Sequence, residues 1–142
     1  MKLSLIGKNA LVCGASRGIG KASAIELSKL GANVTLLART EASLILAMGE
    51  LDTSKGQVHT ILVADATNHE DITKKISELV SKKVIQVLVN NTGGPAAGPI
   101  TDAKPEQFMA AFAHHLVSNH IISSLVIPGM KTENFGRIIN MI

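Results

Sequence analysis

A glycine-punctuated segment near the amino terminus could bind an anion through its backbone. Gly14, Gly18 and Gly20 follow the apolar residues 11–13, and a helical pattern begins at Gly18 or Ile19. The first N–H groups of a helix have no intrahelical partner, and the helix dipole adds partial positive charge there. A pyrophosphate fits such a site when no side chains intervene. The predicted binding segment is Gly14, Ala15, Ser16, Arg17, Gly18, Ile19 and Gly20.

Each glycine has an expected task in that segment. We expect Gly14 to make the tight turn, Gly18 to allow close approach of the backbone, and Gly20 to pack the helix on a sheet. Glycines also end strands and cap helices for structural reasons alone. The context favours binding, because an apolar strand pattern precedes the segment and a helix and a second strand follow it.

Charge at the end of the second predicted strand indicates which dinucleotide fits. An acid at this point bonds the ribose 2′-OH of NAD and repels a 2′-phosphate. Residues 33–37 are followed by Ala38, Arg39 and Thr40, with no acid at the tip. Arg39 and Arg17 could both pair with a 2′-phosphate. The sequence therefore favours NADP over NAD, with a merely solvated Arg39 as the alternative.

The elements that must position these residues alternate between strands and helices. Predicted strands cover residues 10–12, 33–37, 58–63, 84–89 and 136–142; predicted helices cover 18–30, 41–51 with Thr40 as N-cap, 69–80 and 105–130, the last divided near residues 114–115. Gly31 stands where a helix C-terminal glycine belongs. This order predicts an α/β fold, a doubly wound parallel sheet with helices on both faces, as a single domain over residues 1–142.

Composition excludes several classes of protein. The 142 residues are 46% apolar and 18% charged with a net charge of +3, which is typical of a folded domain. Only three aromatic residues occur, all Phe, and no basic block exceeds two residues, so nucleic-acid binding is not expected. The single cysteine, Cys13, excludes an internal disulfide and is expected to fill a buried strand. We expect no metal site at His114, His115 and His120, because adjacent residues face different sides of a helix.

Targeting signals are also not expected. No uninterrupted apolar run reaches the roughly 18 residues that span a bilayer, and the amino terminus lacks a signal-peptide pattern. These observations predict a cytoplasmic protein without a membrane partner.

Four motifs in one order resemble the short-chain dehydrogenase/reductase family, in the manner of its 3-oxoacyl-carrier-protein reductases. Residues 13–20 are similar to its T-G-x3-G-x-G with Cys for Thr, residues 90–93 to its N-N-A-G, and residues 136–140 to the strand before its catalytic Ser. Asp65 and Ala66 stand where the family contacts adenine. The resemblance implies a Rossmann fold, hydride transfer with a nicotinamide cofactor, and contacts from Asn91 and Gly93 to the adenosine side of that cofactor.

The chain lacks the catalytic residues that are typical of the family. It ends inside a predicted strand at Ile142 and has no Tyr, so the family's Tyr-x3-Lys acid–base pair is not among these residues. We therefore expect the N-terminal half of a family domain, of a divergent branch, that binds cofactor without turning over. A cleaved polypeptide and a longer one with a disordered remainder both stay open.

His115 takes the position of the family's catalytic Asn, counted back from Gly136. A neutral imidazole can donate and accept, so His115 could serve in a proton relay. Equally open is a role in packing or hydrogen bonding within its helix.

Three functions remain as hypotheses. The first is an NADP-dependent reductase or dehydrogenase acting on a small-molecule carbonyl or alcohol. The second is a catalytically silent relative that acts as a sensor or partner subunit, and the third is a half-domain with an assembly role. The small-residue segment 94–99 is expected to shape the substrate mouth. Apolar residues on more than one face of the helix 105–130 predict that part of it packs on a partner subunit, with burial inside the rest of the domain as the alternative. The resemblance implies a homodimer or homotetramer built with this helix.

Overall fold

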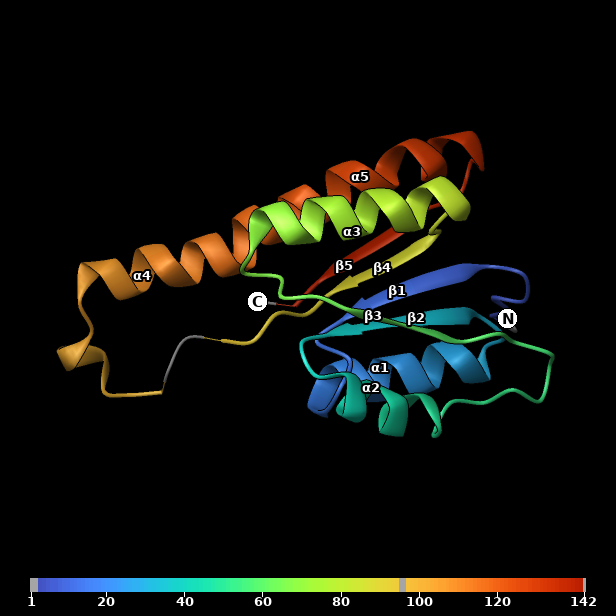
Figure 1. Ribbon diagram of the computed structural model, residues 1–142, viewed down its shortest axis with the longest axis horizontal. Helices are drawn as coiled ribbons and strands as arrows, with labels where there is room; N and C mark the ends of the chain where they lie inside the picture. The colour runs from blue at the N-terminus through green and yellow to red at the C-terminus, as the bar shows by residue number, and fades with distance from the viewer. Residues whose placement is uncertain (1–2, 95–96, 142) are drawn as a thin grey trace.

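Five parallel strands form one sheet in the computed structural model, which describes residues 3–94 and 97–141, and their order is β3-β2-β1-β4-β5 (Figure 1). The strands are β1 (Asn9–Cys13), β2 (Asn33–Ala38), β3 (Thr60–Val63), β4 (Val87–Asn90) and β5 (Arg137–Asn140). The helices are α1 (Gly18–Lys29), α2 (Glu41–Met48), α3 (His69–Lys82), α4 (Pro105–Phe112) and α5 (Ser118–Thr132), with a short 3-10 turn at Ile100–Asp102. The predicted doubly wound parallel sheet is confirmed.

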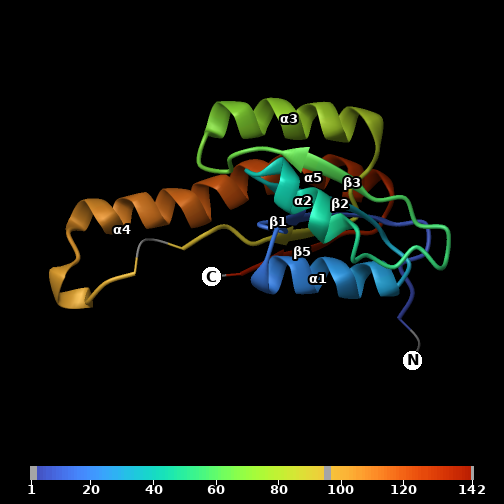
Figure 2. The ribbon, with the colours of Figure 1, turned by 60° about the horizontal axis from the view of Figure 1, so that its bottom comes forward.

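Helices cover both faces of the sheet. α1 and α2 lie on one face and α3 and α5 on the other (Figures 1 and 2). Two apolar clusters fill the layers: Ala24 and Leu44 belong to the first, and Ile72 and Ile122 to the second. Strand order reverses between β1 and β4, and such a reversal opens a crevice at the carboxyl ends of the strands.

The long helical region is divided where the sequence indicated. α4 and α5 are joined by a π-helical segment, η2 (Ala113–Val117), within one continuous helical stretch. α5 packs against α3 and β4, whereas α4 extends beyond the sheet (Figure 1). This division places the π-helical segment beside the carboxyl edge of the sheet.

The helices α2 and α3 end at residues other than the predicted ones. α2 ends at Met48 rather than at residue 51, since the buried Leu51 continues the apolar pattern past the end of the helix. Thr40 occupies the N-cap position as predicted, but its side chain makes no capping hydrogen bond. α3 runs two residues beyond the predicted position 80.

Three strands are shorter than predicted, and two of them for the same physical reason. The N–H of Val34 donates to His59 Nδ1 at 3.1 Å in place of a backbone partner, so β3 begins at Thr60 rather than at residue 58. Asn9 Nδ2 donates to Val84 O at 2.8 Å, and β4 begins at Val87 rather than at residue 84. β5 covers residues 137–140 of the predicted 136–142, and residue 142 lies outside the described residues.

One helical stretch in the described part is long and apolar enough to cross a membrane. It runs over Pro105–Thr132 with a mean hydropathy of 1.2 in an 18-residue window. This stretch contains no uninterrupted apolar run of that length, because Ser, His and Asn residues interrupt it without lowering the average hydropathy much. A mostly buried core helix of a globular domain meets the same criterion; here Ile122 and Val126 are buried against the sheet layer, and 22% of the window is buried in all.

Candidate cofactor site

The glycine segment forms the turn between β1 and α1 at the carboxyl edge of the sheet. Gly14 and Gly18 have positive φ angles of 60° and 56°, a region that L side chains adopt at a cost. A Cβ on Gly14 would lie 2.2 Å from the Asn91 carbonyl oxygen, and one on Gly20 would lie 2.2 Å from the Gly14 carbonyl oxygen. The tight turn at Gly14 and the close packing at Gly20 follow the sequence expectation.

Gly18 differs from its two neighbours. A Cβ built on Gly18 meets no protein atom within 4 Å. The positive φ is therefore the feature of the backbone that favours glycine at this position. The space above Gly18 is open to solvent, as is the exposed side chain of Ile19. A ligand could therefore approach the backbone here without meeting a side chain on Gly18.

The amino end of α1 carries partial positive charge that favours an anion. Arg17 occupies the N-cap position without a capping hydrogen bond from its side chain, and no acidic residue stands in the first turn. Partial positive charge from the helix dipole is therefore not compensated by the protein at this end.

Asn91 connects the end of β4 to the glycine turn. Its Nδ2 donates a long hydrogen bond of 3.4 Å to the Gly14 carbonyl oxygen. Its backbone N–H faces Cys13, whose thiol is buried at the end of β1. Burial raises the pKa of Cys13 to about 12, although the Asn91 N–H opposes that rise. Cys13 is a neutral core residue, as expected.

The carboxyl ends of β2 and β3 bring Arg39 and Asp65 together. Asp65 Oδ1 accepts hydrogen bonds from Thr67 N at 2.9 Å and from Thr67 Oγ1 at 2.8 Å. These bonds lower the pKa of the Asp65 carboxyl below its usual value, and the positive charges of Arg39 and His114 lower it further. Arg39 itself is exposed. The site therefore combines one internally bonded carboxylate with a solvent-facing guanidinium.

Ala66 is tied to the start of α5 by a residue that the sequence did not single out. Ser118 is buried, and its Oγ donates to Ala66 O at 2.8 Å. The imidazole Nε2 of His69 lies 3.2 Å from the Ser118 Oγ, within hydrogen-bond distance. His69 is close in sequence to the motif at 65–66, but no sequence signal indicated Ser118, which is 52 residues from Ala66.

His115 lies in η2 and contacts the turn after β4. Its Nδ1 is 2.9 Å from the Thr92 hydroxyl oxygen. Thr92 was quoted only as part of the motif at 90–93, and nothing in its spacing indicated a partner. Gly93 is exposed and open space surrounds its α-carbon, so the structure assigns it no contact.

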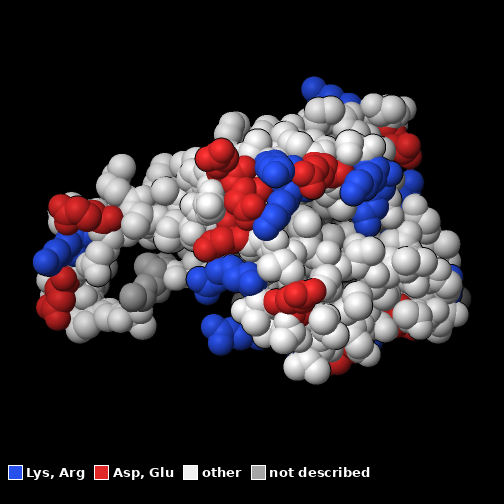
Figure 3. All heavy atoms as spheres, viewed as in Figure 1, with Lys and Arg blue, Asp and Glu red and all other residues white. Residues whose placement is uncertain are grey.

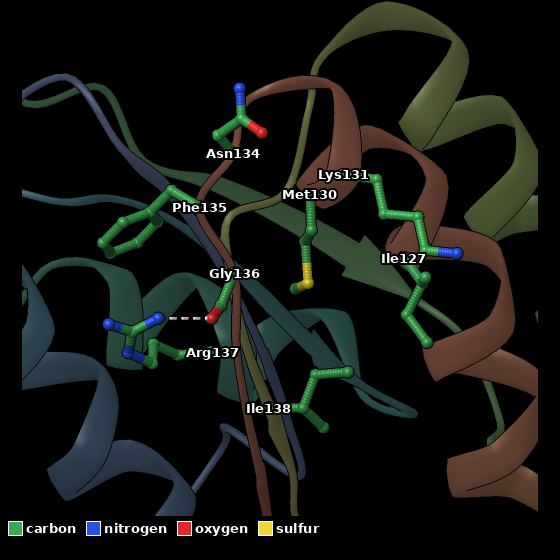
Figure 4. A pocket seen from close by; sticks show the side chains of 8 residues that line it. All are labelled: Ile127, Met130, Lys131, Asn134, Phe135, Gly136, Arg137 and Ile138. Carbon is green, nitrogen blue, oxygen red and sulfur yellow. Dashed lines mark hydrogen bonds between the residues drawn. The ribbon is translucent and has the colours of Figure 1, made fainter.

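Two surface hollows lie at different distances from these elements. One is at the amino end of β5, the opposite edge from the glycine turn (Figure 4); there Phe135 lies between the cations of Lys8 and Arg137, at 5.2 and 4.8 Å from the ring centre. The other lies between residues 97–103 and α4 and includes Phe108 and His114. It is the only one of these two that borders the segment expected at the substrate mouth, of which residues 95–96 lie outside the described ones.

Within the described ranges 3–94 and 97–141, no group of three or more His, Cys, Asp or Glu side chains is arranged to hold a metal ion. Acidic and basic side chains are interspersed over the face drawn in Figure 3. The described site is thus built from backbone N–H groups, basic side chains and hydrogen-bonding groups.

Comparisons with known proteins place these features in context. The model of the family described as short chain dehydrogenase matches residues 8–142. A tropinone reductase homolog of Arabidopsis thaliana is 37% identical over 97% of this chain and 53% of its own length. The 3-oxoacyl-[acyl-carrier-protein] reductase FabG of Pseudomonas aeruginosa is 35% identical over 98% of this chain and 56% of its own length.

A solved structure is similar as well. A metagenomic short-chain oxidoreductase in complex with NADP superposes with a TM-score of 0.82 and 32% identity, over 94% of this chain and 60% of that one. The chain spans about half the length of the curated relatives it matches.

Proposed function

The chain belongs to the short-chain dehydrogenase family, and from this premise we propose that it binds NADP(H) for hydride transfer between nicotinamide and a small carbonyl or alcohol compound. The observation that carries the proposal is the uncapped amino end of α1, which follows β1 at the reversal of strand order, together with the exposed Arg39 at the end of the neighbouring strand β2. The names of the curated relatives support a carbonyl substrate, since both are reductases or reductase homologs.

The pyrophosphate is assigned to the turn of residues 14–20. Its charge complements the free N–H groups of α1, and the open space at Gly18 leaves room for the phosphate oxygens. Arg17, exposed beside these N–H groups, adds a mobile positive charge.

The 2′-phosphate of NADP is assigned to Arg39. Its guanidinium is exposed and stands where an acid would repel that phosphate. A bidentate guanidinium–phosphate contact is charge-assisted and is worth about 1.5–3 kcal/mol. The complex of the similar oxidoreductase with NADP supports this choice of cofactor.

The adenosine is assigned to the loops that follow β3 and β4. Asp65 and Ala66 follow β3 and would border the adenine, while Asn91 and Gly93 follow β4 and would present backbone to the ribose. His115 adjoins the same turn through Thr92. When bound, the nicotinamide gives or takes the hydride, and the protein orients it.

Catalytic turnover is not expected from these 142 residues alone. They contain no Tyr, so the family's Tyr-x3-Lys pair is not among them. We expect NADPH binding without reduction of a carbonyl substrate by this chain. A protein that binds neither NADPH nor NADH would instead favour an assembly role.

The test is a fluorescence titration of Arg39→Gln with NADPH and NADH. Loss of the phosphate contact is expected to weaken NADPH about tenfold or more, since 1.4 kcal/mol corresponds to tenfold, and to leave NADH nearly unchanged. Lys74→Gln on α3 removes the same charge from another exposed position and serves as the control. An equal loss of affinity for both nucleotides would contradict the assignment of Arg39.

A further inference from the structure

Thr92 and His115 form a polar pair that the proposed cofactor contacts do not use. Thr92 follows β4, and His115 lies 23 residues later in η2. The 2.9 Å between Thr92 Oγ1 and His115 Nδ1 is within the range of a good hydrogen bond. Thr92 directly follows Asn91, whose Nδ2 bonds the Gly14 carbonyl of the glycine turn.

The backbone around His115 is held independently of that pair. The N–H of Ser118 bonds Ala113 O, five residues back, which makes the wide turn of a π-helix. The Ser118 hydroxyl donates to Ala66 O at 2.8 Å, with Ala113 O farther away at 3.3 Å, and so anchors the end of η2 to the loop after β3. π-helical turns inside α-helices are frequent at functional sites. The chain thus fixes the backbone of His115 through Ser118 and its ring through Thr92.

The inventory of donors in the protein favours one of the two possible proton arrangements. A threonine hydroxyl has one hydrogen, and the Thr92 hydroxyl has no other partner among the described residues. Nδ1 of a neutral imidazole accepts a hydrogen bond only when the ring proton is on Nε2. If Thr92 donates to Nδ1, the only hydrogen of its hydroxyl is paired. If Nδ1–H donates to Thr92 instead, the hydroxyl hydrogen has no protein acceptor among the described residues.

We propose that Thr92 is a positioning residue that donates to His115 Nδ1 and thereby presents Nε2–H to an oxygen atom of a ligand bound at the carboxyl edge of β4. The oxygen belongs to a carbonyl or alcohol compound, or to a water that solvates it. This inference rests on the proposed function, because it assigns His115 to the substrate side of the same site.

Nitrogen-15 NMR of the labelled chain tests the pair without any cofactor. Two-bond proton–nitrogen correlations distinguish the ring nitrogens, and His115→Gln identifies the His115 signals. We expect Nε2 to carry the proton and Nδ1 to show the upfield shift of a hydrogen-bond acceptor. Predominance of the Nδ1–H form in the unmutated chain would overturn the proposal before any variant of Thr92 is made.

Variants of Thr92 test the cause of that signature. Thr92→Val keeps the shape of the side chain but removes the donor, so the Nδ1 signal is expected to move toward that of an unbonded nitrogen. Thr92→Ser is expected to restore it. Thr132→Val, at the far end of α5, removes a hydroxyl bonded to Pro128 O and is the matched control. Unchanged His115 signals in folded Thr92→Val would contradict the positioning role.

An NADPH titration of the unmutated chain separates this proposal from the proposed function. If NADPH does not bind but His115 has the expected tautomer, the proposed cofactor is contradicted and the Thr92–His115 hydrogen bond is supported. NADPH binding together with a His115 ring that does not respond to Thr92→Val would keep the cofactor site and overturn the pair.

Discussion

At the scale of single residues, the glycines of the turn are required for different physical reasons. Gly20 is helical, and a Cβ there would lie 2.2 Å from the Gly14 carbonyl oxygen. Gly18 has open space around it but a φ of +56°. One position thus excludes a side chain by packing, and the other makes it costly by backbone conformation.

Replacement of each glycine by alanine should separate these two causes. Gly18→Ala is expected to lower the free energy of unfolding by about 1–2 kcal/mol, the cost of a left-handed L residue. Gly20→Ala requires movement of backbone and is expected to cost about 3 kcal/mol or more. Urea denaturation of the two variants measures the difference, and a Gly18→Ala loss as large as that of Gly20→Ala would contradict the packing argument.

Cys13 offers a second prediction at this scale. Burial raises the pKa of its thiol to about 12 from the ordinary 9.0, so the folded chain keeps the neutral thiol. A thiol reagent at pH 8 is expected to label Cys13 only after unfolding in urea, because the thiolate is the nucleophile. Since the unfolded thiol ionises first, this group's contribution to stability is full below pH 9 and falls as the pH rises toward 12. Rapid labelling of the native chain would show that Cys13 is accessible.

At the scale of elements, side chains replace part of the strand ladder between β2 and β3. The imidazole of His59 accepts from the buried Val34 N–H through Nδ1, and its Nε2 lies 3.0 Å from Asp52 O. Because Nδ1 accepts from an N–H, the ring proton is on Nε2 and donates to that carbonyl. One side chain therefore connects β2 to the irregular segment before β3.

Removal of that imidazole should destabilise the edge of the sheet. His59→Leu leaves the Val34 N–H without its partner, and we expect a loss of about 1–3 kcal/mol in the free energy of unfolding. His120→Leu changes an exposed histidine of α5 and is the control, with an expected change within about 0.5 kcal/mol. Thermal or urea unfolding gives both values, and equal effects would contradict a structural role for His59.

At the scale of the whole molecule, α4 presents an apolar surface that the described residues do not cover. Phe108, Met109 and Phe112 are 56%, 70% and 57% exposed. A contiguous exposed apolar patch of this kind marks an interaction surface. The sequence hypothesis of a homo-oligomer therefore remains a prediction for this helix.

Charge on this surface tests the hypothesis. We expect light scattering after gel filtration to give a mass above 14.9 kDa for the unmutated chain, and a mass near that value for Phe108→Asp/Phe112→Asp. Leu46→Asp on α2 replaces an even more exposed apolar side chain (74%) away from α4 and should leave the mass unchanged. An unmutated chain that remains at 14.9 kDa over the micromolar range would contradict self-association through α4.

The sequence by itself determined the order of the elements, the parallel sheet and the place of the glycine turn. These features depend on local patterns: the apolar strands 10–12 and 33–37, the glycines after the first strand, and Gly31 at the end of α1. Such patterns act between residues that are near in the chain, where spacing alone fixes the geometry.

Only the tertiary structure decided which residues from different elements meet. Thr92 and His115, Ser118 and Ala66, and His59 and Val34 are separated by 23, 52 and 25 residues. No local periodicity encodes such pairs, because their contact depends on how the crossovers place one element beside another. The boundaries of β3 and β4 were mispredicted for the same reason: side chains from distant positions, His59 and Asn9, take hydrogen bonds that strand patterns assign to backbone.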